Sequence, residues 1–417
     1  MEKQYFDHKI AIIGAGISGL TIANLLKERY DVTLFEKETN PGGLIRCRRE
    51  ADGSLFHICG GHVFNTKHSH VLNWFWSHFD CNKEFVKADR NSIVFMPDGK
   101  EIPYPIENHV YKLDKQTQLQ FIQDLLNMSQ EHISDNFEDF LITRFGTTLY
   151  KLYFQPYNTK VWRRPLNTIP LSWLEGKLPM PTVTEMIYNN FNHIEEKDFV
   201  HSTFYYEKQD GSQFIANRLA EKLHIHYNQY IEKIQYIKGK WQVQGEIFDK
   251  IVFCGNIKQL PNLLNGMECI SKYAGSIEKL EFHGTTSVFC KIDCNPYSWI
   301  YLPNMEYQSH RIICTGNFAA SNNAGNNLTG TIEFTDYMSL DDILNQLKQI
   351  PLHPQYIDHH YSQYTYPIQN VDTRNIVKNL KTELSKMGFY MTGRFADWEY
   401  YNMDAAIEAA MKVCGDI

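Results

Sequence analysis

The stretch Lys9–Lys37 limits the fold of this chain more than any other segment. It opens with the short apolar run Ile10–Ile13, which is typical of a parallel strand buried on both faces. Apolar residues at helical spacing follow over residues 20–26, and residues 31–35 read as a second apolar strand. The segment therefore predicts a strand, a tight turn, a helix and a second strand in succession.

Three glycines, Gly14, Gly16 and Gly19, occupy the predicted turn in the pattern GxGxxG. The first permits the tight turn, the second lets the backbone approach a pyrophosphate, and the third lets the helix pack on the strand. The start of the helix offers free N–H groups and a positive dipole end to a phosphate. Glu36 lies 22 positions after Gly14, where an acid accepts the hydroxyls of an adenosine ribose. A glycine turn without a ligand is the alternative, but the combined spacing favours a dinucleotide.

Glu36–Lys37 is followed by Pro41-Gly42-Gly43-Leu44. An acid–lysine pair followed by two glycines resembles the second fingerprint of FAD-dependent oxidases and mutases, and is not usual in NAD dehydrogenases. This resemblance implies that the dinucleotide is FAD.

Composition excludes several classes of function. The 417 residues predict two or three domains, and a net charge of −7 gives no general attraction to nucleic acid or anionic lipid. Residues 10–26 are too short and too rich in glycine for stable membrane insertion. The nine cysteines are scattered without a CxxC pair, which suits reduced thiols in a cytoplasmic protein. We predict no metal, because the histidine pairs at 68/70 and 359/360 lack a supporting carboxylate frame.

The rest of the chain alternates between helical and strand patterns. We predict a hairpin over 92–105, an amphipathic helix over 113–144 and a helix over 214–223. Residues 151–181 read as an irregular, aromatic and functional segment. Predicted strands are 224–227, 230–237, 241–243, 250–255, 285–292, 299–302, 311–315 and 331–334, and the tail repeats strand, turn and helix over 388–413.

These patterns predict an α/β protein of three parts. The first is a discontinuous Rossmann-like FAD-binding domain formed by residues 1–90, 205–270 and 385–417. The second is an antiparallel-sheet substrate domain formed by 91–112, 163–204 and 271–384, and the third is a helical insertion over 113–162.

Four stretches together carry a more particular resemblance. They are GGHVFNT at 60–66, FQPYNTKVW at 154–162, TYPI at 365–368 and GRFADWEYYNMDAAI at 393–407. With them the chain resembles UDP-galactopyranose mutase and its flavoprotein relatives over most of its length.

The resemblance implies a set of site residues. His62 corresponds to a histidine beside the flavin, and Arg311, Tyr366 and Tyr400 to the residues that contact a diphosphate; these four are the candidate catalytic residues. The implied substrate-binding residues are Phe154, Tyr157, Trp162, Arg311, Tyr366 and Tyr400. The candidate cofactor-binding residues are Gly14, Gly16, Ser18, Gly19, Glu36, Lys37, Gly43, Leu44, Gly61, His62, Ile231, Gly393, Arg394, Asn402 and Met403. Core packing of the aromatics and a surface ion pair for Arg311 are the alternatives.

One position departs from the family pattern. The mutases carry an arginine after the KxW segment, and alignment through Pro170 and residues 178–179 puts Pro181 there. Arg163 or Arg164 would have to supply the missing charge, since each charge-assisted contact to a diphosphate is worth about 1.5–3 kcal/mol.

The implied activity is a sugar-nucleotide mutase of the UDP-galactopyranose mutase type, without net redox. By this resemblance, N5 of the reduced flavin would attack the anomeric carbon of a nucleotide sugar and displace the nucleoside diphosphate, and the sugar ring would then open and reclose in the other size. The alternative is an FAD-dependent oxidase or desaturase related to amine or protoporphyrinogen oxidases, and a third hypothesis is an FAD-binding assembly protein with a decayed site. A nucleotide sugar is the expected partner, and a homodimer is compatible with the resemblance.

Overall fold

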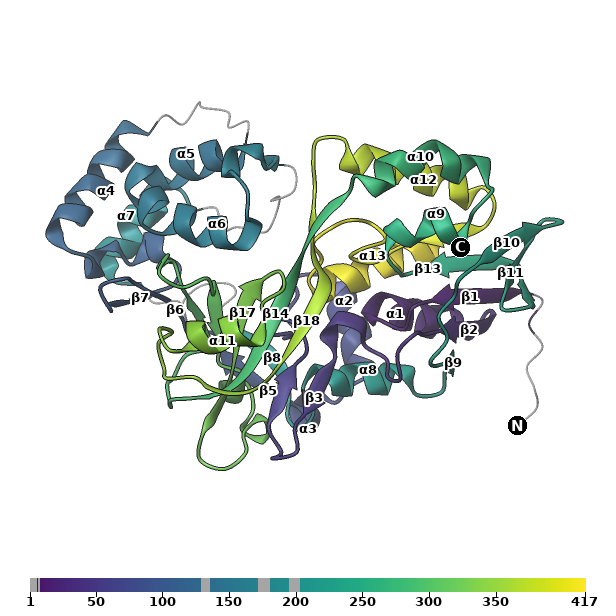
Figure 1. Ribbon diagram of the computed structural model, residues 1–417, viewed down its shortest axis with the longest axis horizontal. Helices are drawn as coiled ribbons and strands as arrows, with labels where there is room; N and C mark the ends of the chain where they lie inside the picture. Colours follow the sequence, from purple (N-terminus) through teal and green to yellow (C-terminus); the bar gives the residue numbers. More distant parts are fainter. Residues whose placement is uncertain (1–5, 7, 129–135, 172–180, 195–202) are drawn as a thin grey trace.

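The computed structural model describes residues 6, 8–128, 136–171, 181–194 and 203–417. It confirms the α/β class, with a parallel sheet, a larger sheet that is mostly antiparallel, and a group of helices beside it (Figure 1). Within the described residues, none of the helices is both long enough and apolar enough to cross a lipid bilayer.

The Rossmann-like region is built on a five-stranded parallel sheet. Its order is β19 (Phe389–Met391), β13 (Lys250–Phe253), β1 (Lys9–Ile13), β2 (Asp31–Phe35) and β9 (His224–His226). The predicted strand at 250–255 thus lies directly beside β1, with Ile10 opposite Lys250. Three distant parts of the chain therefore meet in one sheet.

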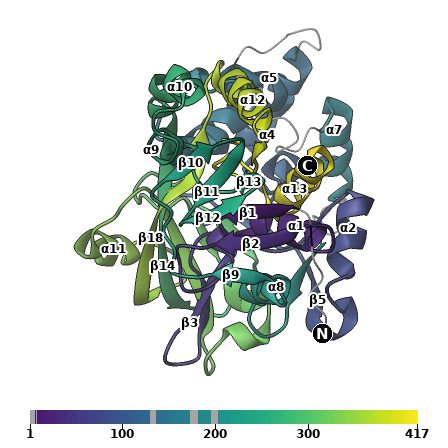
Figure 2. The same cartoon turned by 90° about the vertical axis from the view of Figure 1, so that its right-hand side faces the viewer.

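Alternation of side chains along β1 explains why both faces of this sheet are covered. Ile10 and Ile12 pack into a core with α1 (Ile17–Leu26), α2 (Ser69–Trp76), α8 (Ser212–Ala220) and α13 (Met403–Asp416). Ala11 and Ile13 face the opposite core, which is formed with β10 (Ile234–Ile237), β11 (Lys240–Val243), β12 (Glu246–Phe248), α9 (Leu260–Leu263), α10 (Glu268–Glu278) and α12 (Thr373–Ser385). Figure 2 shows α1 and α13 on one side of β1, and β10 to β12 on the other.

The second sheet has seven strands, in the order β18 (Gln355–Ile368), β14 (Glu281–Ile292), β17 (Leu328–Thr335), β16 (Arg311–Ile313), β15 (Trp299–Tyr301), β6 (Ser92–Phe95) and β7 (Glu101–Pro103). All neighbours are antiparallel except β15 and β6. The hairpin predicted over 92–105 is confirmed as β6 and β7. The long strands β14 and β18 run from the seven-stranded sheet toward α10 and α12 (Figure 1).

The helical group contains α4 (Lys115–Asn127), α5 (Phe137–Leu149), the π-helical turn η4 (Tyr150–Phe154), α6 (Gln155–Trp162) and α7 (Val183–Asn192). Helix α7 lies within 163–204, and Met186 on this helix is buried in the same core as α4 to α6. The smaller elements are η1 (Gly43–Ile45), β3 (Cys47–Arg49), β4 (Leu55–His57), α3 (Cys81–Glu84), β5 (Phe85–Asp89), η2 (Ile106–Asn108), η3 (Val110–Lys112), η5 (Leu166–Thr168), β8 (Thr203–Glu207), η8 (Ile257–Gln259), η9 (Thr315–Asn317), η10 (Ala320–Asn322) and α11 (Leu340–Leu347).

Several sequence-based expectations for local structure were wrong. The helix predicted over 113–144 is divided, because α4 ends at Asn127 and α5 begins at Phe137. The segment 151–181 is not irregular throughout, because η4 and α6 are helical; residues 172–180 lie outside the described residues. Pro156 lies in the first turn of α6, where proline is tolerated. Strand β18 was not predicted, because its first ten residues are only partly buried and lack a clear apolar period. The strand expected over 230–237 begins only at Ile234.

Candidate functional site

The glycine turn after β1 has the geometry of a phosphate-binding turn. Gly14 adopts φ 103°, which favours glycine, and its N–H donates to the carbonyl of Phe35 at 2.8 Å. A Cβ on Gly19 would lie 2.0 Å from the carbonyl oxygen of Gly14, so only glycine lets α1 approach this closely. At Gly16, by contrast, a Cβ would meet only the Cα of Gly43 at 3.9 Å, which leaves room in front of the turn.

The acid at the end of β2 is fixed to that turn. The buried Glu36 carboxylate accepts from the N–H of Ala15 at 2.7 Å and from the N–H of Glu38 at 3.0 Å. The backbone carbonyl of Glu36 accepts a hydrogen bond from the N–H of Gln229 at 2.8 Å. Two residues later, the buried Ile231 packs in the same core as Phe35 of β2. Lys37 is exposed and its ammonium lies 3.6 Å from the Glu38 carboxylate, so the structure turns Lys37 toward Glu38.

The carboxyl end of the parallel sheet gathers the remaining predicted cofactor residues. An ideal Cβ on Gly393, just after β19, would lie 3.4 Å from Oγ of Ser18 in the first turn of α1. Gly43, which precedes Leu44 in η1, lies against Gly16. Asn402 is the N-cap of α13 and Met403 its first residue, so this helix begins near the same edge.

The loop Gly60–His62 connects this edge to the seven-stranded sheet. Gly60 has φ 68° and donates its N–H to Oε1 of Glu333 at 3.0 Å, while a Cβ on Gly61 would lie 2.7 Å from Cγ2 of Ile313. Among the described residues, the buried Nε2 of His62 has no hydrogen-bond partner. Burial, followed by the nearby His57, lowers the pKa of His62 to about 3, so this ring is neutral.

Arg311 and Glu333 occupy opposite positions on the neighbouring strands β16 and β17. The Nε of Arg311 donates to Oε2 of Glu333, and one Nη2 N–H donates to Oη of Tyr366 at 3.2 Å. Burial raises the pKa of Glu333, but Arg311 and His310 more than offset this effect and bring it to about 2. Burial likewise lowers the pKa of Arg311, and Glu333 keeps it well above its ordinary value. The guanidinium is therefore charged, oriented and partly exposed.

Three of the predicted aromatic residues form a continuous wall beside Arg311. The rings of Tyr366 and Tyr400 are stacked, with centroids 5.4 Å apart and planes at 6°. The edge-to-face contact between Trp162 and Tyr366 has a centroid distance of 5.7 Å and an angle of 88°. Residues from α6, β18 and the loop before α13 are thus brought together.

The other two predicted aromatics lie on α6 and η4, away from this wall. Tyr157 stacks on Tyr153 and meets Tyr301 edge to face at 5.5 Å, and its hydroxyl interacts with the charge of Arg311. Phe154, by contrast, stacks on Phe145 of α5 at 4.5 Å within the helical core. The structure therefore directs Tyr157 toward Arg311 and Phe154 into the core.

Arg394 is held largely by backbone carbonyls. Its Nε and Nη2 donate to the carbonyl of Tyr401, and Nη1 donates to the carbonyl of Thr365 at 3.1 Å. The guanidinium lies over the ring of Tyr400, 4.7 Å from its centroid. Arg394 thus fixes the loop that carries Tyr400.

The arginines that were considered as substitutes for the missing charge face carboxylates. Arg163 lies 3.8 Å from Asp336, and Arg164 forms an ion pair with Glu281. Pro181 directly precedes Thr182, the N-cap of α7, whose hydroxyl accepts from the N–H of Glu185.

Sequence reasoning missed two residues that build the site. Glu333 is the single acid in the otherwise uncharged strand LTGTIEFT. An isolated acid in such a strand indicates a buried charge that needs a partner, which here is Arg311. Lys160 on α6 is buried and donates to the carbonyls of Leu302, Asn304 and Ser309, which fixes α6 to the loop before Arg311.

The fold and the glycine turn define a Rossmann-like domain. Residues 12–79 match the family model described as an NAD(P)-binding Rossmann-like domain.

The particular relatives are mutases. UDP-galactopyranose mutase from Mycoplasma genitalium is 21% identical over 425 residues, which cover 97% of this chain and 93% of the relative. A dTDP-fucopyranose mutase from Escherichia coli is 28% identical over 182 residues, 42% of this chain and 46% of that protein. A crystal structure of reduced UDP-galactopyranose mutase has a TM-score of 0.86 at 20% identity, over 98% of this chain and 93% of the other. The chain is therefore a homologue of UDP-galactopyranose mutase and shares its fold.

Proposed function

We propose that this protein is a flavin-dependent mutase that interconverts the pyranose and furanose forms of a nucleotide sugar without net redox. The observation that carries the proposal is the position of Arg311. Glu333 holds the guanidinium of Arg311 and, through its other oxygen, the N–H of Gly60. One carboxylate therefore joins a diphosphate-binding residue to the loop that would face the cofactor.

The residues at the edge of the parallel sheet fit FAD. The cradle around Gly14, Gly16 and Gly19 suits a pyrophosphate, and the Glu36 carboxylate has lone pairs left for ribose hydroxyls. The neutral His62 has a buried Nε2 for which the described protein offers no partner, which is what a residue packed against a polar cofactor requires. When bound in its reduced form, the flavin would supply the nucleophile for the anomeric carbon.

The protein would contribute positioning and electrostatic stabilisation. Arg311 presents a planar, permanently charged fork to the departing diphosphate, and its contact with Glu333 keeps that fork in place. Tyr366 and Tyr400 would add hydroxyl donors without burying further charge, and Trp162 would cover the nucleotide from α6. Only contacts that strengthen as the diphosphate leaves would raise the turnover rate.

The test is isomerisation by the reduced protein. The dithionite-reduced protein is incubated with UDP-galactopyranose, UDP-galactofuranose and dTDP-fucopyranose, and ring-size isomers are separated by chromatography. We expect one nucleotide sugar to be converted in both directions with no reductant consumed per turnover. Oxygen uptake with amines or porphyrinogens would instead favour the oxidase alternative, and bound flavin with neither activity would favour an assembly protein.

Two further expectations belong to this proposal. All nine cysteines are free, which is consistent with a cytoplasmic enzyme. Light scattering of the purified protein would show whether it forms the homodimer that is compatible with the resemblance.

A further inference from the structure

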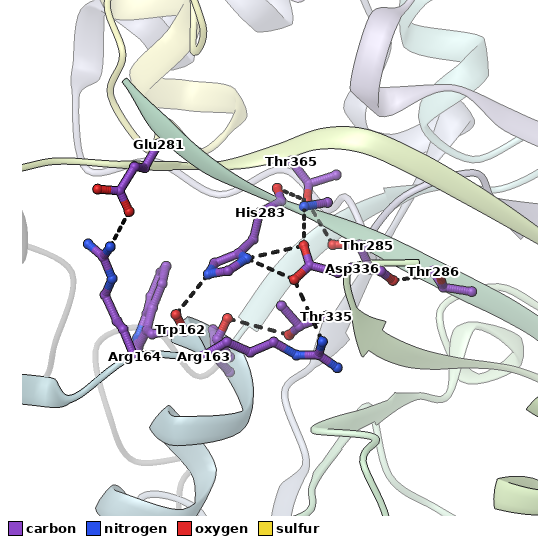
Figure 3. Close-up of polar contacts among 12 residues, drawn as sticks. Trp162, Arg163, Arg164, Glu281, His283, Thr285, Thr286, Thr335, Asp336 and Thr365 are labelled. Carbon is purple, nitrogen blue, oxygen red and sulfur yellow. Dashed lines mark hydrogen bonds and ion pairs between the residues drawn. The ribbon is translucent and has the colours of Figure 1, made fainter. Parts of the chain in front are cut away.

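The two ring nitrogens of His283 contact acceptors from different parts of the fold (Figure 3). His283 lies on β14, and its Nδ1 is 3.1 and 3.0 Å from the two carboxylate oxygens of Asp336, which directly follows β17. On the other side of the ring, Nε2 is 2.8 Å from the carbonyl oxygen of Trp162, the last residue of α6. A carboxylate and a carbonyl can only accept, so both contacts are made together only when both nitrogens carry a proton.

Asp336 is fixed independently of the histidine. It adopts φ 65°, its N–H donates to the carbonyl of Gly284 at 2.9 Å, and its Oδ1 accepts from the N–H of Gly284 at 3.0 Å. Burial raises the pKa of this carboxyl, but His283, the Gly284 N–H and the charge of Arg163 together bring it below its ordinary value. The carboxylate after β17 is therefore a fixed, ionised acceptor.

The α6 side of the contact is a helix end that needs donors. The last carbonyls of a helix have no partner within the helix, and the negative end of its dipole favours a cation there. Thr335 donates its hydroxyl to the carbonyl of Val161 at 3.4 Å, and His283 faces the next carbonyl, that of Trp162. Arg163 then leaves the helix with φ 44°.

This helix end positions part of the proposed substrate wall. Trp162 lies edge to face on Tyr366, and Tyr366 is the residue opposite His283 in the β14–β18 register. A shift of the end of α6 away from the sheet would therefore move the indole relative to Tyr366 and the nearby Arg311.

We propose that His283 is a positioning residue that, as an imidazolium, ties the end of α6 to Asp336 and so holds Trp162 against the substrate site; this inference rests on the proposed function for its kinetic consequence. When the ring loses one proton, the remaining N–H stays on the carboxylate, which is the stronger acceptor. The Nε2 lone pair then faces the Trp162 carbonyl, and α6 loses this contact.

Other charged groups lie around the ring. They are Asp336, Arg163 at 3.8 Å from Asp336, and the ion pair of Arg164 with Glu281 (Figure 3). Tyr366 on β18 stays neutral, because burial raises its pKa well above the ordinary value. Burial lowers the pKa of Lys160, two residues before Trp162 on α6, to about 7, so a change of pH also acts on this helix through Lys160 and the variants are compared at one pH.

The test compares the KM for the nucleotide sugar in wild type, His283→Phe and Asp336→Asn at one pH. We expect His283→Phe to raise the KM about tenfold with little change in kcat, because the contact to the Trp162 carbonyl is lost. In Asp336→Asn the amide can donate to Nδ1, which leaves the proton on Nε2 for Trp162, so the KM should stay close to the wild-type value.

A second readout does not depend on substrate. Amide hydrogen exchange at residues 160–164, measured without nucleotide sugar and at one pH, should be faster in His283→Phe than in wild type. His353→Asn is the matched control, because it removes an exposed histidine–aspartate pair with Asp293, 2.6 Å apart, at the other end of β14 and β18. It should leave both readouts unchanged.

The outcomes separate the two proposals. Normal exchange and normal KM in His283→Phe, or a KM in Asp336→Asn raised as much as in His283→Phe, would overturn the role of His283. If wild type converts no nucleotide sugar but the exchange result is obtained, the proposed function fails and the contact between His283 and α6 stands.

Discussion

Arg311 and Glu333 face each other across β16 and β17, and the same glutamate accepts the N–H of Gly60. The carboxylate therefore orients a residue of the proposed substrate site and a loop of the proposed cofactor site at once. A substitution at Glu333 should therefore affect both the proposed substrate site and the proposed cofactor site.

Glu333→Gln should weaken turnover more than it weakens flavin binding. The amide can still accept from Gly60 but no longer balances the charge of Arg311. Loss of one charge-assisted contact corresponds to about a 10- to 100-fold fall in kcat/KM. Steady-state kinetics and the visible absorbance of bound flavin measure the two effects. A wild-type kcat/KM would contradict the role assigned to this pair.

Arg311→Lys should lower kcat/KM without unfolding the protein. Lysine keeps the charge but cannot contact Glu333, Tyr366 and a diphosphate together. Arg311→Ala, by contrast, leaves a buried carboxylate unpaired, which should cost about 3–5 kcal/mol of stability. Kinetics of the lysine variant and urea unfolding of both variants would distinguish these effects. Equal stability of the two variants would argue against a buried ion pair.

Tyr400→Phe and Tyr366→Phe should each reduce kcat/KM while flavin stays bound. Both keep the stacked rings and lose only a hydroxyl, so about a 2- to 10-fold effect is expected. Tyr366→Leu is the comparison, since it also removes the ring that contacts Trp162, and should lower kcat/KM further. If all three variants behaved as wild type, this aromatic wall would not be the substrate site.

Gly16→Ala should abolish dinucleotide binding in a folded protein. A methyl group at Gly16 meets only Gly43 at an ordinary contact distance, but it would occupy the space in front of the turn. Gly19→Ala should instead destabilise the fold, because its methyl would lie 2.0 Å from the carbonyl oxygen of Gly14. Circular dichroism and flavin absorbance separate the two results. A yellow, stable Gly16→Ala protein would contradict the proposed cofactor position.

Acid should destabilise the protein through its buried histidines. Burial lowers the pKa of His57 to about 4 and that of His62 to about 3, whereas an unfolded histidine titrates at about 6.5. The unfolded state therefore takes up protons first as the pH falls. This part of the stability is complete above about pH 6.5 and is lost as the pH falls toward 4 and 3. Urea unfolding at a series of pH values should show this slope, and His62→Asn should reduce it.

The parts of the fold that could be predicted from sequence are those with local signals. The apolar run at 10–13, the glycine turn and Glu36 predicted β1, α1 and β2, and the apolar run at 250–255 predicted a buried strand, which the structure places beside β1 as β13. Strand β18 could not be found in the same way, because its polar residues pack on β14 rather than showing an apolar period of their own. Helix α6 was missed because Pro156 is compatible with both a helix start and a break.

The site residues could be predicted from sequence only where they lie in a motif shared with the family. The four family stretches led to Trp162, Tyr366 and Tyr400, which the structure brings together. The partners of the residues that were missed lie far from them in the sequence. Arg311 is 22 positions from Glu333, Asp336 is 53 positions from His283, and Ser309 is 149 positions from Lys160. A local sequence pattern cannot predict such pairs. The roles of these residues in binding and turnover stay predictions.

Strand β1 lies between β2, which follows it closely in the chain, and β13, which comes some 240 residues later, while β19 closes the sheet from the last thirty residues. Pairings this remote require large loops to close before they give any stabilisation, so the contact order is high and folding should be slow. On the ribosome, the proposed dinucleotide pocket cannot be completed until α13 has emerged. Loading of the cofactor is therefore expected only after this helix has been synthesised, and a truncation that removes α13 should yield a colourless chain.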